Sequence, residues 1–139
     1  MKNNPAFWNT SKAPSLADFE AIAASAYAGL PEGFREASRD VRIVIADFPT
    51  EEVMDALDCE TPFDLLGLFH GIGLAQGAAT PYTGQMPNTV SLYRRPILDY
   101  WAEHDETLGA IIAHVLIHEI GHHFGFSDAD MEAIEAQAD

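Results

Sequence analysis

Residues 106–124 constrain the fold most, because they predict one long helix that is apolar on nearly every face. The apolar positions in this stretch are Leu108, Ile111, Ile112, Val115, Leu116, Ile117 and Ile120. A helix that is hydrophobic all round is buried on most sides. The same helix carries His118, Glu119 and His122. Burying such polar groups costs free energy unless they are partnered, so the sequence predicts a central helix whose polar residues have a function.

The polar residues of this helix match the pattern HExxH over positions 118–122. His118 and His122 are expected on one helical face, about 40° apart in projection and roughly 6 Å apart along the axis. That spacing lets two imidazoles bind one metal ion. Glu119 projects about 60° away from His122, from where it can take a proton from a water molecule on the metal. The pattern therefore predicts zinc at His118 and His122, with Glu119 as the general base.

The residues that follow the motif predict a third metal ligand. Gly125 comes three residues after His122, and Asp128 comes six residues after it. A glycine at this place can adopt the left-handed conformation that ends a helix and turns the chain. The turn would bring Asp128 back to the metal, in an HExxHxxGxxD variant of the longer zinc-peptidase pattern. Three protein ligands leave one position for water, so we expect one Zn²⁺ per chain.

Other interpretations of the same residues stay open. His118 and His122 could be a half-buried pair that binds no metal. Asp128 could be an acid favoured at a helix N-terminus, because Ser127 has the character of an N-cap and Asp130 stands where a capping box needs an acceptor. That role is compatible with metal binding. The reserve candidates for the third ligand are Asp130, Glu132 and Glu135.

The rest of the chain predicts a small sheet backed by helices, which is an α+β fold. Segments 41–47, 65–70 and 89–93 have strand composition. Helices are expected at 14–30, 32–38, 49–57 and 96–101, then from Asp105 as the cap of the long helix, and again from about 128. Residues 71–88 form a long loop rich in Gly, Pro and Thr, and a loop of this length in a small domain is often functional.

The chain length predicts a single domain. Its 139 residues, 47% of them hydrophobic, are enough for one core without disulfides. Residues 1–13 are expected to form a loose N-terminal arm, with Phe7 and Trp8 packed onto the domain. We therefore predict one domain over residues 1–139.

Charge and composition exclude several classes of protein. The formal net charge is −15, from 22 acidic residues against seven Lys and Arg. This acidic surface repels nucleic acid. It would favour basic peptides as partners, although solubility is the more frequent reason for such a surface. No apolar run approaches about 18 residues, so no membrane span is predicted. Asp18 and Glu20 stand where a signal peptide needs a basic flank, and the single Cys59 suits a reducing compartment. We expect a cytoplasmic protein.

The C-terminal third resembles the small bacterial zincin-like metallopeptidases sometimes called minimal zincins. The matching tract is 114–128, in which the doubled histidine at 122–123 and the Ser-Asp pair at 127–128 are the most specific parts. Segments 90–96 and 65–69 also look like strands of that family. With these segments, the resemblance covers most of residues 14–139.

The resemblance implies a compact zincin-like domain with a small mixed sheet, a buried zinc helix and a short C-terminal helix. It implies zinc at His118, His122 and Asp128, with Glu119 as the base. Met131 is expected to pack beneath the last turn of the zinc helix. The resemblance does not supply a substrate, because assignments in such families rest largely on the motif.

Residues outside the motif carry weaker predictions. His114 is expected to pack against the sheet or to support the ligands, and His123 to make a supporting or capping hydrogen bond, neither of them binding the metal. His70 is expected to end a strand near the loop, where it could line the cleft. Candidate donors to a developing oxyanion are Tyr82, Tyr93, Arg94 and Arg95. A peptide substrate is expected to lie along an exposed strand edge at 89–93.

The function predicted from these residues is that of a zinc-dependent metallopeptidase. Two alternatives use the same site. One is a non-catalytic zinc-binding or interaction module with a zincin fold, and the other is a zinc hydrolase of a non-peptide amide or ester. The presence of Glu119 favours an enzyme, because a purely structural zinc site does not need a base and usually has four protein ligands.

Overall fold

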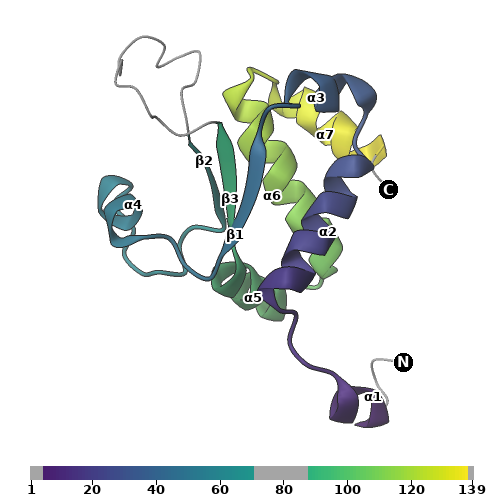
Figure 1. Ribbon diagram of the computed structural model, residues 1–139, viewed down its shortest axis with the longest axis vertical. Coiled ribbons are helices and arrows are strands. Elements are labelled where there is room, and N and C mark those ends of the chain that lie inside the picture. Colours follow the sequence, from purple (N-terminus) through teal and green to yellow (C-terminus); the bar gives the residue numbers. More distant parts are fainter. Residues whose placement is uncertain (1–4, 71–87, 138–139) are drawn as a thin grey trace.

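The computed structural model describes residues 5–70 and 88–137. Within these ranges the elements are α1 (Pro5–Thr10), α2 (Leu16–Ala28), α3 (Glu32–Ala37), β1 (Arg42–Ala46), α4 (Glu51–Ala56), β2 (Gly67–His70), β3 (Thr89–Tyr93), α5 (Arg94–Glu103), α6 (Leu108–His123) and α7 (Asp128–Gln137). Helices and a small sheet together confirm the α+β class (Figure 1). The predicted functional loop, with Tyr82, lies outside the described residues except for Asn88. In the described part, no helix combines the length and apolar character needed to cross a membrane.

The three strands form one mixed sheet in the order β1-β3-β2. The central strand β3 runs parallel to β1 and antiparallel to β2, and all five of its residues are buried. The prediction that a peptide lies along the edge of Thr89–Tyr93 is therefore wrong, since both sides of β3 are already paired. Among the described residues, β1 and β2 are the edge strands of the sheet.

Helix α6 packs across one face of this sheet, with α2 and α7 against its other sides (Figure 1). Side chains alternate between the two faces of a strand, so Val90 and Leu92 of β3 point to the face that α6 covers and pack in the core with its residues. Strand β2 lies close to α6 at Gly67. A Cβ atom there would lie 2.6 Å from Val115 Cγ1 and 3.0 Å from the carbonyl oxygen of Ser91, so a larger residue would push the edge strand off the helix.

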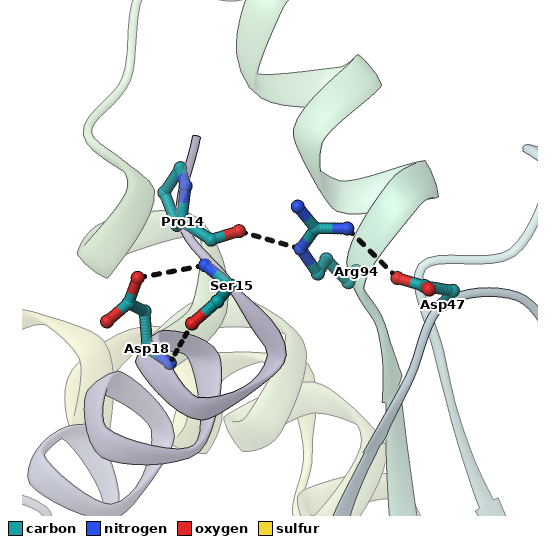
Figure 2. A network of polar contacts seen from close by, with 5 residues as sticks. All are labelled: Pro14, Ser15, Asp18, Asp47 and Arg94. Carbon is teal, nitrogen blue, oxygen red and sulfur yellow. Dashed lines mark hydrogen bonds and ion pairs between the residues drawn. The ribbon is translucent and has the colours of Figure 1, made fainter. Parts of the chain in front are cut away.

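The start of α2 and the ends of two strands are joined by a polar network (Figure 2). Ser15 caps α2, because its Oγ accepts from the Asp18 backbone N–H at 3.0 Å and its own N–H donates to Asp18 Oδ2 at 2.8 Å. Arg94 Nε donates to the Pro14 carbonyl at 2.7 Å, and its Nη1 pairs with Asp47 Oδ1 at 3.0 Å. These contacts give Arg94 a structural role, which argues against it as an oxyanion donor.

The N-terminal arm contains a helix that the sequence did not predict. Helix α1 stands apart from the sheet and from α6 (Figure 1). The side chains of Phe7 and Trp8 are 44% and 56% exposed, and their rings meet edge to face with centroids 4.7 Å apart. The expectation that both aromatics pack onto the domain is therefore wrong. The single domain over residues 1–139 stays a prediction.

Helix starts differ from prediction by a few residues. Thr107, and not Asp105, caps α6, because its hydroxyl accepts from the Ala110 N–H at 3.2 Å. Helix α5 begins at Arg94, two residues before Pro96. Proline is tolerated there, since the N–H it lacks would have no partner in the first turn of a helix.

Candidate metal centre

The α6–α7 hairpin, residues 108–137, turns where the sequence predicted. Gly125 has a φ of 83°, which confirms the left-handed position that only glycine adopts without strain. Ser127 then opens α7 through the predicted capping box. Its N–H donates to Asp130 Oδ2 at 3.2 Å, and its Oγ accepts from the Asp130 N–H at 3.0 Å. Asp130 is thus used by the cap.

Helix α7 returns along α6 and is fixed against it by Met131 (Figure 1). Met131 is fully buried, and a Cβ atom on Gly121 would lie 2.9 Å from its Cγ and 2.5 Å from its Sδ. The prediction that Met131 packs beneath the last turn of the motif helix is confirmed. Glu135 lies one helical turn after Met131, so it faces the same side of α7 and reaches α6 nearer the start of that helix.

His118 and His122 share one face of α6, with ring centroids 6.0 Å apart. The His122 side chain is 63% exposed and that of His118 is 24% exposed. Asp128 Oδ1 lies 3.9 Å from His122 Nε2, and the Asp128 side chain is 84% exposed. The turn therefore brings Asp128 to the second histidine of the motif, in a loose and solvent-facing contact. We call His118, His122 and Asp128 the turn set.

Glu119 points from α6 toward strand β2. Its Oε1 accepts a hydrogen bond from the Phe69 backbone N–H at 3.2 Å. Burial raises the pKa of the Glu119 carboxyl, and the Phe69 hydrogen bond and the charges of His122 and His118 offset part of that rise. A carboxylate with a raised pKa holds a proton more readily, which suits a general base. Nothing local in the sequence links residues 69 and 119, so only the fold reveals this contact.

Glu135 makes the closest polar contacts to the histidines. His118 Nε2 donates to its Oε1 and His114 Nδ1 donates to its Oε2, both at 2.9 Å. Burial alone would raise the pKa of Glu135, but the hydrogen bonds and charges of the two histidines outweigh it and hold the pKa below its usual value. From the sequence, Glu135 was predicted only as a reserve ligand, and His114 was predicted to pack or to support the ligands. We call His114, His118 and Glu135 the open-end set.

Both sets have donor types that fit zinc, but among the described residues only the open-end set has its three ligand atoms already gathered. In the open-end set, one ligand atom from each residue lies within 4.8 Å of the others. Ligand atoms about 2.1 Å from a tetrahedral zinc are about 3.4 Å from each other, and the contacts of 2.9 and 3.9 Å in the two sets lie on either side of this value. Two imidazoles and one carboxylate are a known zinc donor set with an open fourth position.

The two sets differ in their relation to the candidate base. Along the axis of α6, Glu119 lies between His118 and His122, whereas it lies beyond the pair formed by His114 and His118. A metal held by the turn set would thus have the carboxylate beside it. Of the two sets, this geometry favours the turn set for chemistry, although the contacts of the open-end set are shorter.

The remaining histidines do not join either set. The His123 ring stacks on Phe69 with centroids 3.6 Å apart and an interplanar angle of 21°, where a supporting hydrogen bond was expected, and burial lowers its pKa. His70 Nε2 lies 2.8 Å from Ser91 Oγ. Strand alternation puts His70, Ser91 and Tyr93 on the face of the sheet away from α6. His70 is therefore a poor candidate for contact with a substrate at the metal. Burial raises the pKa of Tyr93, and the charge of Glu119 adds to that rise, so Tyr93 stays a candidate donor near the base.

A groove of about 780 Å³ lies between α2 and α6 and is lined mainly by small residues of these helices. Glu135 stands on its wall, but Glu119 and His122 are not among the residues that line it. The groove is thus separate from the place where the turn set and the base meet.

A family model described as zincin-like metallopeptidase matches residues 38–138. The matched range contains all three strands, helices α4 to α7 and every residue of both sets. No curated protein matches the chain.

Proposed function

Because the chain belongs to the zincin-like metallopeptidase family, we propose that it is a zinc-dependent peptide hydrolase. His118, His122 and Asp128 hold the zinc, one ion per chain, and Glu119 is the general base. The observation that carries this proposal is the position of Glu119. It lies between the two motif histidines on α6, half-buried, and touches the backbone of β2.

When bound, zinc supplies a positive charge that polarises the scissile carbonyl and makes a water molecule more acidic. Glu119 accepts a proton from that water as its oxygen attacks the carbonyl carbon. The same carboxyl then gives the proton to the leaving amine nitrogen as the C–N bond breaks. The raised pKa of Glu119, caused mainly by burial, supports both proton transfers.

The outer edge of β2, which has no paired strand among the described residues, is the best place for the substrate backbone. Strand β2, Gly67–His70, is an edge strand of the sheet, and its Phe69 N–H already contacts Glu119. An extended peptide that added to this edge would run past the base, with its main chain held by hydrogen bonds. The net charge of −15 favours basic peptides through long-range attraction.

One observation favours the alternative of a zinc-binding module without catalysis. Glu135 engages His118 at 2.9 Å, so a motif histidine already has a strong partner away from Glu119. The two functions differ in whether the base matters, which makes Glu119 the residue to test.

The test replaces Glu119 by Gln, which keeps the shape of the side chain and removes its basicity. Zinc content should stay unchanged, and hydrolysis of a diverse peptide library should fall by about 10²-fold or more. Glu103→Gln is the matched control, because Glu103 is exposed at the end of α5. The Glu103→Gln protein should have full activity. A zinc-loaded, folded wild type that cleaves no peptide would support the non-catalytic module. Equal activity of wild type and Glu119→Gln would exclude Glu119 as the base.

A further inference from the structure

The open-end set contains a zinc-competent arrangement that the proposed catalytic site does not use. We propose that His114 Nδ1, His118 Nε2 and the Glu135 carboxylate form a second zinc site, which competes with the turn set for the same ion. The inference rests on the proposed function only in taking the turn set as the catalytic site. Its own basis is the geometry around Glu135.

The donor atoms converge from two helices. His114 and His118 are one turn apart on α6, with ring centroids 4.1 Å apart. Glu135 meets one nitrogen of each at 2.9 Å, using a different carboxylate oxygen for each. Small movements would bring three atoms that already lie within 4.8 Å of one another to the separation of about 3.4 Å expected around tetrahedral zinc.

Packing holds this arrangement, and solvent can reach it. Met131, one turn before Glu135, is buried against Gly121 and sets the distance between α7 and α6. The side chains of His114, His118 and Glu135 are 55%, 24% and 30% exposed. A zinc ion can therefore enter from water, and the carboxylate that receives it is already in place.

The two sites exclude each other because they share one atom. His118 Nε2 can donate its lone pair to a single metal ion. An ion in the open-end set would lie on the far side of His118 from Glu119, since that carboxylate follows His118 toward the end of α6. Zinc in this second site is held away from the base, so Glu135 lowers the fraction of chains with zinc in the catalytic position.

The experiment removes the turn set and asks whether zinc still binds. His122→Ala should still bind one zinc per chain in competition with a chromogenic chelator, and Co²⁺ in its place should give a visible spectrum that reports protein ligands. Adding Glu135→Gln should weaken this binding by more than the roughly 10- to 100-fold typical of groups that only orient a ligand. Glu132→Gln is the matched control on α7, because Glu132 is exposed and its loss changes the charge equally.

Three results would overturn the second site. One is a folded His122→Ala protein that binds no zinc. Another is a Glu135→Gln effect no larger than that of Glu132→Gln. The third is a wild type that binds two zinc ions per chain, which would contradict the exclusion. Asp128→Asn disables the same turn set without touching α6, so it replaces His122→Ala if that variant fails to fold. A wild type without peptidase activity would count against the proposed function and leave these metal measurements unaffected.

Discussion

The two ends of the α6–α7 hairpin present the same donor types, but with different distances between donors and different exposure to solvent. At the turn, His122 and Asp128 are 3.9 Å apart and largely exposed. At the open end, Glu135 holds His114 and His118 at 2.9 Å. Both carboxylates lie on α7, two turns apart, but only Glu135 follows the buried anchor Met131. The difference shows that packing between helices, more than the motif itself, decides which carboxylate is held close to a histidine.

The two ends also differ in their distance along α6 from the proposed base. The better-packed end has no base beside it, whereas the looser end is next to Glu119, which touches β2. A carboxylate in an exposed first helical turn can adjust when an ion binds, at the cost of ordering its side chain. Substitutions at each end can test how far the two ends are independent.

The largest effect should come from His118→Ala, because His118 is common to both sets. Zinc affinity should fall further than in His122→Ala or in Glu135→Gln, each of which spares one set. Chelator competition measures this order. His123→Ala is the control, since its ring stacks on Phe69 and binds no metal in either set. Zinc affinity in His118→Ala equal to that of His122→Ala would mean that the two ends do not share a ligand.

Asp128→Asn should lower peptidase activity without lowering zinc content. The change removes the charged ligand of the turn set and leaves the open-end set intact, so zinc should stay near one per chain while peptide hydrolysis falls by more than about 100-fold, beyond the range of supporting groups. Elemental analysis and a peptide assay on the same sample measure both quantities. Full activity in this variant would assign the third catalytic ligand to another residue, with Glu135 the next to test.

Gly121→Ala should disturb the anchor shared by both ends. The new methyl group would meet buried Met131, and overpacking of this kind destabilises a protein by about 1–3 kcal/mol. Urea denaturation measures the loss. Gly109→Ala is the control in the same helix, because nothing lies within 4 Å of its added Cβ. There the better helix propensity of alanine should increase stability by up to about 1 kcal/mol. Similar values for the two variants would show that α7 is not held at Gly121.

The smallest effect should come from Gly125→Ala, which acts on the turn alone. Alanine at a φ of 83° costs about 1 kcal/mol. Zinc binding by the turn set should therefore weaken. In the His122→Ala protein, where only the open-end set is complete, adding Gly125→Ala should leave zinc affinity unchanged. Gly33→Ala in α3, where the added Cβ meets nothing within 4 Å and φ is not positive, provides the control. Equal weakening at both ends would mean that the turn also positions Glu135.

Much of the candidate site follows from residues close together in the chain. The spacing of His118, Glu119 and His122, the left-handed Gly125 and the capping box at Ser127 each depend on contacts within about four residues, and the structure has all of them as expected. The strand Thr89–Tyr93 also has the predicted bounds. Helical spacing and backbone preference act locally, so a single sequence contains the information.

Only the tertiary structure decided which distant segments meet. Strand composition did not reveal that β3 is central, because pairing partners are chosen by packing over the whole sheet. Glu119 meets Phe69 across 50 residues, and Glu135 reaches His118 across 17. The motif in the sequence therefore determined where a metal and a base can be. The close packing of α7 on α6, which depends on Gly121 and Met131, decided that a second carboxylate shares one of the histidines.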